Sequence, residues 1–366
     1  MNCYIFGAHS RAQTVAEYIR VLHPKTRILG YIVDNDEENQ EQIKDIPVIQ
    51  LKNGCWPDGY ALEDKATVYL GIRGQYHAEV TDRLWRVGFR DIIPVTPKLD
   101  IELRNRYMKK AFALQGRDFC KMDEVLFEVD GAFSFEGIKT AVYVAKSAVD
   151  RPLSQDVALK EYEYLIQAGH ALAECDIDGC AIYDDAGENI SERNRQFSEL
   201  TGLYWLWKHA DDDVIGLEHY RRRFLLPNGW QRLFAQGKAD VILPVPLYVA
   251  PSLKENYLFR HDHRPWEAMM RRMKEIPDLY DAAEEFFSTT GCYSPCNMMI
   301  VRKSVLDDLC SWMFPIILGA ADEVGVLEDT YQNRYGGFLS ERMITFFFWY
   351  YRDKYKVLYA DKSFLG

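Results

Sequence analysis

The sequence predicts an α/β protein with two domains: a Rossmann-like parallel-sheet domain over residues 1–105, a connector over 106–138 and a second α/β domain over 139–366. The chain has 366 residues, whereas a single hydrophobic core stops growing at roughly 250. Strand and helix patterns alternate through the first hundred residues, and the alternation starts again after residue 139. Between them, residues 107–137 mix charge and aromatics, which indicates a helix plus a connector.

In the first domain, apolar strand patterns alternate with helical spacing. The predicted strands are Cys3–Phe6, Ile28–Val33, Ile46–Ile49, Ala66–Gly71 and Asp91–Pro94. The predicted helices are Thr14–Leu22, with Ser10 as the candidate N-cap, and Thr81–Val87. Repeated strand–helix units of this kind favour a parallel, doubly wound sheet.

The second domain repeats the pattern with longer helices. Its predicted strands are Thr140–Ala145, Ile177–Tyr183, Val214–Leu217, Asp240–Pro244, Cys296–Val301 and Val357–Ala360. Its predicted helices are Phe197–Lys208, Trp266–Phe287, Ser304–Ile317 and Leu339–Tyr351, and the polar segment Asp156–Ala168 also has helical content.

Composition excludes several classes of protein. Lys plus Arg is 44 and Asp plus Glu is 55, a net charge of −11, which argues against a nucleic-acid partner. The longest apolar run, Ile344 to Tyr351, is too short to cross a bilayer, and no basic signal-peptide start is present. No two of the eight cysteines have CxxC spacing, so a zinc site is not expected. We expect a cytoplasmic protein with reduced thiols, able to associate with the inner face of the membrane through partners.

The loop after the first strand has the position of a nucleotide-binding loop. Gly7, His9 and Ser10 lie between a strand and a helix, where backbone N–H groups can face a phosphate, and Asp34 ends the next strand, where a ribose-binding acid would lie. Only Gly7 fits the GxGxxG pattern, because His9 occupies the next glycine position and the third glycine is also missing. We therefore expect no NAD, and a Rossmann-like module without a dinucleotide is the alternative to a nucleotide site.

Polar residues suited to chemistry gather in the middle of the chain. Asp184 and Asp185 end a predicted strand and lead into a turn that contains Asn189, and paired carboxylates there can hold a metal, a ribose or a sugar hydroxyl. Glu199 and Tyr204 lie about one helical turn apart and can face one cleft. A capping or surface role is the alternative for Glu199.

A second polar group follows the strand predicted over Val214–Leu217. Glu218 and His219 stand at its end, where α/β sheets build sites, although a purely structural histidine is the alternative. The next residues are the three arginines 221, 222 and 223, and guanidinium groups pair bidentately with phosphate. If the strand continues, Arg221 and Arg223 share one face and Arg222 takes the other.

These residues carry a resemblance. The runs ELTGLYWLWK (199–208) and GLEHYRRRF (216–224) are similar to a family of bacterial capsule and lipopolysaccharide glycosyltransferase domains, long labelled as of unknown function. The later runs DVILP (240–244), NMMI (297–300) and GFLSER (337–342) agree with it. The resemblance covers about residues 139–362 and implies a GT-A-like fold. Over residues 1–100, the runs GYIVDN (30–35), IPV (46–48), YLG (69–71) and GF (88–89) resemble the small nucleotide-sugar-binding domain of bacterial sugar acetyltransferases.

The family resemblance implies a nucleotide-sugar donor, such as a UDP-hexose with galactose or its furanose form, and a lipid-linked or oligosaccharide acceptor. The expected donor-binding residues are Asp184, Asp185, Asn189, Glu199, Tyr204, Glu218, Arg221, Arg222 and Asn297. The expected acceptor residues are His261 and His263, in a loop. A nucleotide-sugar-modifying enzyme of the reductase type and a noncatalytic polysaccharide-assembly protein remain as alternatives.

The catalytic candidates are Glu341 and His219. Glu341 follows two glycines at the start of a predicted helix, a position that resembles that of the base in inverting GT-A enzymes; a carboxylate favoured by the helix dipole is the alternative. Typical GT-A enzymes bind Mn²⁺ or Mg²⁺ through an Asp-x-Asp, but here the corresponding strand ends in Glu218 and His219, which are the only metal candidates there. The acidic run 211–213 precedes that strand and is interpreted as a solvated turn.

Overall fold

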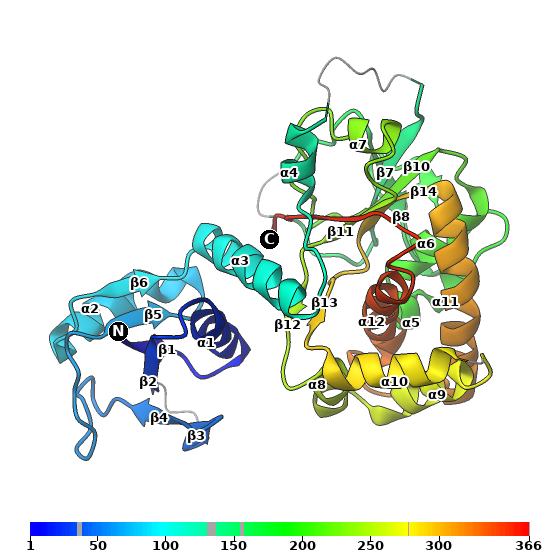
Figure 1. Cartoon of the computed structure of the whole chain (residues 1–366). Coiled ribbons are helices and arrows are strands. Elements are labelled where there is room, and N and C mark those ends of the chain that lie inside the picture. Colours follow the sequence, from blue (N-terminus) through cyan, green and yellow to red (C-terminus); the bar gives the residue numbers. More distant parts are fainter. Residues whose placement is uncertain (35–38, 130–136, 154–156, 277, 366) are drawn as a thin grey trace. The chain divides into compact units, whose positions relative to one another are not determined.

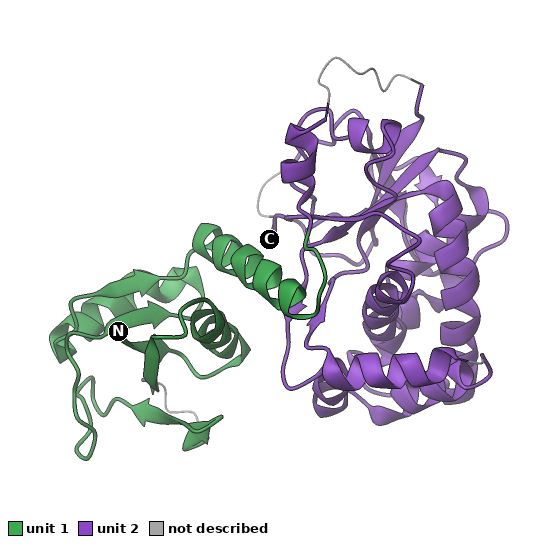
Figure 2. Ribbon diagram, in the orientation of Figure 1, with its two compact units in different colours: residues 1–119 green, residues 120–366 purple. Residues whose placement is uncertain are grey.

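The structure is a computed structural model that describes residues 1–34, 39–129, 137–153, 157–276 and 278–365. The chain divides into two compact units, unit 1 over Met1–Phe119 and unit 2 over Cys120–Gly366 (Figure 2). The division falls within the predicted connector, so that helix α3 (Pro97–Leu114) belongs to unit 1 and helix α4 (Met122–Phe127) to unit 2. Both units are α/β, which confirms the predicted fold class.

Unit 1 contains a six-stranded sheet with the order β3-β4-β2-β1-β5-β6 (Figure 1). Its strands are β1 (Asn2–Phe6), β2 (Arg27–Val33), β3 (Gln42–Ile43), β4 (Ile46–Gln50), β5 (Thr67–Leu70) and β6 (Ile92–Pro94). Neighbouring strands are parallel except β3, which pairs antiparallel with β4. Strand order reverses at β1, as in a doubly wound sheet.

Helices cover both faces of this sheet. They are α1 (Ser10–Leu22), α2 (His77–Val87) and α3, with a short 3₁₀ helix at Gly74–Tyr76. Successive side chains of β1 point to opposite faces, so Ile5 packs in one cluster with Val15 of α1 and Phe6 packs in another with Leu84 of α2. The alternation of buried residues in β1 thus supplies both cores of the unit.

Unit 2 contains a seven-stranded sheet with the order β15-β11-β14-β10-β7-β8-β9. Its strands are β7 (Thr140–Lys146), β8 (Glu163–Gln167), β9 (Ile182–Tyr183), β10 (Val214–His219), β11 (Val241–Pro244), β14 (Met299–Arg302) and β15 (Val357–Ala360), and β12 (Leu247–Tyr248) pairs separately with β13 (Cys292–Tyr293). Strand β14 runs antiparallel to both of its neighbours, while the other pairs are parallel. The carboxyl ends of β7, β8 and β10 therefore meet at one edge.

The helices of unit 2 pack on this sheet and on one another. They are α4, α5 (Asn194–Phe197), α6 (Leu200–His209), α7 (Arg232–Ala235), α8 (Leu253–Arg260), α9 (His263–Met273), α10 (Leu279–Thr289), α11 (Lys303–Val324) and α12 (Tyr335–Tyr350), with 3₁₀ helices at His170–Leu172, Ser191–Arg193 and Gln332–Arg334. Met122 of α4 and Leu233 of α7 share a core with Val142 and Ile300 of the sheet. Helix α11 packs against α6, α9 and α12.

Several local predictions are wrong. The segment predicted with helical content begins at Asp156, outside the described residues, and its C-terminal part is strand β8. The helix predicted over Phe197–Lys208 is broken at Ser198 and Glu199 into α5 and α6, and the one predicted over Trp266–Phe287 is the pair α9 and α10. Cys296 and Asn297 form a turn before β14 because both have positive φ angles.

Two predictions about polar side chains also fail. His9, not Ser10, is the N-cap of α1, and Ser10 is the first helical residue. The acidic run 211–213 is not simply solvated: Asp212 is buried and accepts a hydrogen bond from the Tyr143 hydroxyl at 2.8 Å. Asp213 accepts one from the backbone N–H of Lys139 at 2.9 Å, so the run anchors the start of β7.

Among the described residues, one helix, α11, is long and apolar enough to cross a bilayer by length and composition. Over half of its most apolar window is buried inside the protein. Residues such as Leu306, Leu309 and Met313 are fully buried, so the apolar stripe of α11 serves the core of unit 2.

Candidate active site

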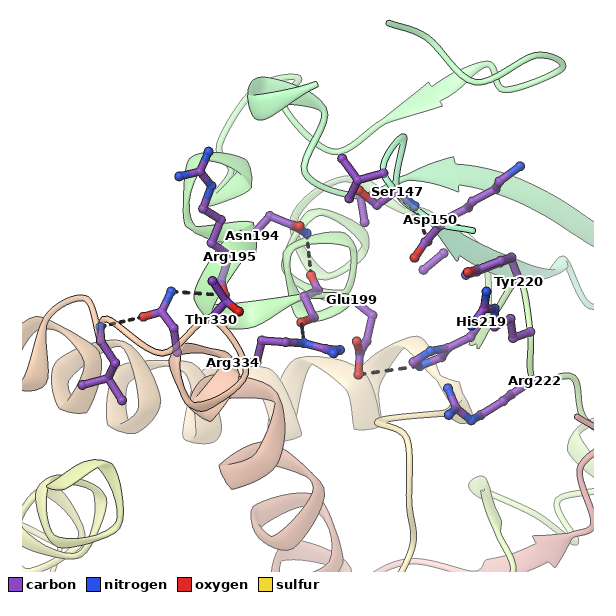
Figure 3. Close-up of a pocket in the computed structure, with 18 of the residues that line it drawn as sticks. Ser147, Asp150, Asn194, Arg195, Glu199, His219, Tyr220, Arg222, Thr330 and Arg334 are labelled. Carbon is purple, nitrogen blue, oxygen red and sulfur yellow. Dashed lines mark hydrogen bonds and ion pairs between the residues drawn. The ribbon is translucent and has the colours of Figure 1, made fainter. Parts of the chain in front are cut away.

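A pocket of about 870 Å³ opens at the carboxyl ends of β7, β8 and β10 in unit 2 (Figure 3). The loops that follow parallel strands meet at one sheet edge, which is where α/β folds build sites. Residues of α5 and of the segment 326–334 before α12 complete the walls. The polar residues that line the pocket are Lys146, Ser147, Asp150, Asn194, Arg195, Ser198, Glu199, His219, Tyr220, Arg221, Arg222, Glu328, Thr330, Asn333 and Arg334.

A tight turn after β10 brings two arginines into the pocket. The backbone N–H of His219 donates to the Arg222 carbonyl at 3.1 Å, and the reverse bond is 3.0 Å. The strand therefore ends at His219, and Arg221 and Arg222 both line the pocket. Arg223 is buried instead and donates to Glu163 at 2.6 Å. The face alternation predicted for these arginines is wrong because the chain reverses here.

The pocket carries more positive than negative side chains. Among the residues that the structure describes, five cationic ones line it against three carboxylates, namely Lys146, Arg195, Arg221, Arg222 and Arg334 against Asp150, Glu199 and Glu328. One of the carboxylates, Asp150, already accepts a hydrogen bond from the backbone N–H of Ser147 at 2.8 Å. This balance suits an anionic ligand with several oxygens, such as a diphosphate.

A histidine–carboxylate pair lies within the same pocket. In Figure 3, the side chains of His219 and Arg222 point toward Glu199. The His219 Nε2 atom is 2.6 Å from the Cys296 carbonyl oxygen and 3.6 Å from Glu199 Oε1. The amide of Asn297 donates to the same Glu199 oxygen at 2.7 Å. The pair is thus held from several elements at once.

Backbone strain is concentrated around this pair. Ser198, Cys296 and Asn297 have φ angles of 50°, 75° and 50°. Among the described non-glycine residues of unit 2, Asp278 is the only other one in this region. Each such residue costs about 1–3 kcal/mol, and strained residues cluster at functional sites. Three of the strained residues of unit 2 therefore lie at or next to the Glu199–His219 pair.

Residues 153–353, more than half of the chain, match the model of the family described as "Domain of unknown function (DUF4422)". The chain belongs to the DUF4422 family. A solved structure of the bifunctional glycosyltransferase WbbM, in its apo form, is similar at 20% identity with a TM-score of 0.53. The alignment covers 62% of this chain and 45% of that one, so the chain spans less than half the length of that relative. A comparison with curated proteins finds no match.

At this identity the likeness concerns the fold alone. The TM-score of 0.53 shows a shared α/β fold. In this chain, the strand order of the large sheet reverses, and β14 is the single antiparallel strand among its described strands. The predicted GT-A-like fold of the DUF4422 domain is thereby confirmed.

Glu341 supports the Cys296–Asn297 turn. It lies in the second turn of α12, not at its start, because the helix already begins at Tyr335. Its Oε1 accepts the backbone N–H of Cys296 at 2.5 Å, and its Oε2 is 3.7 Å from Arg342 Nη1. Burial raises the pKa of this carboxyl. Among the described residues, Glu341 is not one of those that line the pocket.

Glu218 faces away from the pocket, since neighbouring strand residues point to opposite faces of the sheet. It is fully buried, and its Oε1 accepts the Phe224 backbone N–H at 2.7 Å while its Oε2 is 4.0 Å from Arg223 Nη1. Burial raises its pKa to about 7. Glu218 and His219 therefore cannot ligate the same ion, and the described residues contain no group of three or more His, Cys, Asp or Glu arranged for a metal.

The predicted carboxylate turn is a structural cap. Asp184 is fully buried and accepts the backbone N–H groups of Gly169 and His170 at 2.8 and 3.0 Å. Asp185 contacts the His170 ring at Nδ1, 2.7 Å away, and the hydrogen bonds with Asp176 and then Asp185 raise the pKa of His170. The Asn189 amide donates to the Asp185 carbonyl at 2.8 Å. These residues fix the chain after β8 and do not line the described pocket.

Tyr204 also lies away from the pocket lining. Its hydroxyl donates to Glu188 at 2.8 Å, and its ring packs edge-on against Phe314 of α11 at 5.0 Å. Glu199 precedes the first residue of α6, after the break, so it does not share a helix face with Tyr204 as predicted.

The predicted acceptor histidines lie at a helix junction. His261 ends α8 and stacks on Phe338 at 4.2 Å, and burial lowers its pKa to about 4, so the ring is neutral. His263 is the first residue of α9, and its Nε2 donates to the Leu258 carbonyl at 2.8 Å. Neither histidine lines the described pocket.

In unit 1 the predicted nucleotide loop has other contacts. The Gly7 backbone N–H donates to the Ile32 carbonyl at 2.8 Å, so it is used within the sheet. Gly7 has a φ of 103°, which requires glycine. Asp34 forms an ion pair with Arg83 of α2, and His9 is the N-cap residue of α1. These contacts favour a structural role for the loop.

Sequence reasoning missed three of the five cationic residues that line the described pocket, namely Lys146, Arg195 and Arg334. Lys146 ends β7, and Ser147 and Asp150 follow it, so the same strand-end rule that selected His219 could have found all three. Arg195 and Arg334 come from α5 and from the residue before α12, and only the tertiary fold brings them to the pocket.

Proposed function

We propose that this DUF4422 protein is a glycosyltransferase that moves a hexose from a nucleoside-diphosphate donor to a hydroxyl group of a glycan. The observation that carries the proposal is a pocket with excess cationic side chains at the carboxyl edge of a GT-A-like sheet, beside the Glu199–His219 pair. Its volume of about 870 Å³ lies within the 300–1,000 Å³ typical of small-molecule sites.

The pocket can stabilise the leaving group. When the glycosidic bond to the donor breaks, negative charge collects on the diphosphate, and fixed positive groups lower the energy of that state. Arg221 and Arg222 stand on a turn closed by two backbone hydrogen bonds, so their positions are set before the donor binds. Arg222 also lies over the Phe364 ring at 5.5 Å.

For the donor we propose a UDP-hexose, with galactose or its furanose form as the first candidates, and for the acceptor a lipid-linked or free oligosaccharide of capsule, O-antigen or exopolysaccharide. The similarity of the runs around residues 199–224 to capsule and lipopolysaccharide glycosyltransferase domains supports this choice. Such an acceptor would place the enzyme in the cytoplasm, at the inner face of the membrane.

Binding of UDP and UDP-hexoses, measured by calorimetry and by thermal shift with and without Mn²⁺ or Mg²⁺, tests the donor site. Arg222→Gln removes a charge-assisted contact worth about 1.5–3 kcal/mol, so we expect affinity for UDP to fall roughly 10- to 100-fold. Arg352→Gln is the matched control, because Arg352 is exposed and is not among the residues lining the pocket.

Two results would redirect the assignment. A wild-type protein stabilised by NAD(P) but not by any nucleoside diphosphate would be a reductase-type enzyme acting on nucleotide sugars. Stabilisation by neither class would indicate a noncatalytic assembly protein.

A further inference from the structure

The Cys296–Asn297 turn contacts His219, Glu199 and Glu341. Resting on the proposed transferase function, we infer that His219 carries its proton on Nε2 and offers Nδ1 as the proton acceptor, and that Glu341 and Asn297 are positioning residues for the carbonyl that fixes this tautomer. The His219 ring lines the pocket, whereas among the described lining residues Cys296, Asn297 and Glu341 do not appear.

The tautomer follows from one contact. A backbone carbonyl oxygen can only accept, so the 2.6 Å contact between Nε2 of His219 and the Cys296 oxygen requires a proton on Nε2. Glu199 Oε1, 3.6 Å from the same nitrogen, favours that proton as well. A neutral imidazole with Nε2 protonated has its lone pair on Nδ1. The other ring nitrogen is therefore the one able to take a proton.

The carbonyl is held in place against backbone strain. Cys296 and Asn297 both have left-handed φ angles, a region that Asn enters more readily than most residues but that is uncommon for Cys. Glu341 accepts the Cys296 N–H at 2.5 Å, and the Asn297 amide donates to Glu199 at 2.7 Å and to the Gly337 carbonyl at 3.1 Å. Ser340 donates to Asn297 Oδ1 at 2.8 Å. Helix α12 thus fixes the conformation of the turn, and the turn fixes the orientation of the His219 ring.

In this arrangement Glu341 positions the Cys296–Asn297 turn and does not act as the base. Its Oε1 is already an acceptor for a backbone N–H, and its Oε2 faces the guanidinium of Arg342. A glutamine at position 341 keeps an oxygen that accepts the Cys296 N–H, whereas an alanine leaves that N–H without a partner. The two substitutions therefore separate a positioning role from proton transfer.

The chemical step is a direct displacement. The acceptor hydroxyl oxygen forms a bond to the anomeric carbon of the donor as its proton passes to Nδ1 of His219. The bond between that carbon and the phosphate oxygen breaks, and its electron pair leaves with the nucleoside diphosphate, beside Arg221 and Arg222. The resulting imidazolium lies next to the Glu199 carboxylate, which stabilises it until the proton passes to water.

Steady-state kinetics on the full chain test whether His219 is the base and Glu341 a positioning residue. We expect His219→Gln to lower kcat by about 10²- to 10⁴-fold, the usual contribution of a general base. Glu341→Gln should stay within a few-fold of wild type, while Glu341→Ala should lose at least about tenfold in kcat with unchanged affinity for UDP. If Glu341→Gln is as inactive as Glu341→Ala while binding UDP normally, Glu341 is the base and the inference is overturned.

A second measurement does not depend on turnover. Long-range ¹H–¹⁵N spectra of the full chain labelled with ¹⁵N-histidine report the tautomer of each ring, and His219→Gln identifies the signal of His219. We expect the Nε2–H form in wild type and in Glu341→Gln, and a mixture of forms in Glu341→Ala. An Nδ1–H form in wild type would overturn the inference even if the protein transfers sugar, and the Nε2–H form would support it even if another donor is used.

Discussion

Glu218 and His219 are adjacent in sequence, yet the pleat of β10 sends their side chains into different environments. His219 enters the pocket, and Glu218 is enclosed with Arg223 and Glu163 behind the sheet. One buried oxygen of Glu218, Oε2, has no hydrogen-bond partner among the described groups. Both residues were predicted to belong to a site because they stand at the end of a strand, but only His219 lines the described pocket.

The enclosed carboxyl of Glu218 makes stability depend on pH. Burial raises its pKa from 4.5 to about 7, so the folded state binds this proton more tightly than the unfolded state does. The resulting stabilisation is complete below about pH 4.5 and is lost as the pH rises through 7. We expect the free energy of unfolding of wild type, relative to Glu218→Gln, to fall by up to about 3 kcal/mol between pH 4.5 and 8.

Urea denaturation of both proteins at several pH values measures this difference. The glutamine can still accept the Phe224 N–H, so the fold should be kept in the control. A wild-type stability that runs parallel to that of Glu218→Gln over this range would contradict the raised pKa.

At the scale of elements, helix α12, which supports the Cys296–Asn297 turn, packs against α5. A Cβ added at Gly336 would lie 2.8 Å from the Phe197 ring and 2.9 Å from the Gln196 carbonyl oxygen. At Gly337, the next residue of the same helix, the nearest atom would be Asn297 Nδ2 at 3.9 Å. Two adjacent glycines of one helix therefore have different packing demands.

We expect Gly336→Ala to destabilise the protein by about 1–3 kcal/mol, because overpacking would push α12 away from α5. Gly337→Ala should be neutral or stabilise by up to about 1 kcal/mol, since alanine favours helix and the space is open. Thermal unfolding of the two variants checks this contrast. Equal melting temperatures would show that α12 can shift without cost.

At the scale of the whole molecule, the predicted start of the second domain at residue 139 differs from the division observed after Phe119. Helix α4 lies between the two positions, and its Met122 and Leu126 are buried in the core with Trp230. The Cys120 carbonyl also accepts the Tyr359 N–H at 2.9 Å. These contacts assign α4 to unit 2.

We expect a fragment of residues 120–366 to fold and to bind the nucleotide, since the whole pocket lies within it. A fragment of residues 139–366 should be less stable by roughly 3–6 kcal/mol, the burial energy of two large apolar side chains. Urea denaturation of both fragments measures the difference, and equal stabilities would place the boundary at residue 139.

The sequence determined by itself the α/β class, the two domains and most strands, because hydrophobic periodicity and strand–helix alternation are local properties. It also proposed His219, Arg221 and Arg222 as site residues because they lie at a strand end, and all three line the described pocket. It could not distinguish them from Asp184, which stands at a similar strand end but caps a neighbouring loop.

Only the tertiary structure decided which polar residues share a site. Arg195 and Arg334 reach the pocket from helices far apart in the chain, and Glu341 meets Cys296 across 45 residues. The break between α5 and α6, which turns Glu199 toward His219, needs a strained Ser198 that no local pattern favours. Periodicity records which face of an element is buried, whereas a site depends on long-range packing that brings separate elements together.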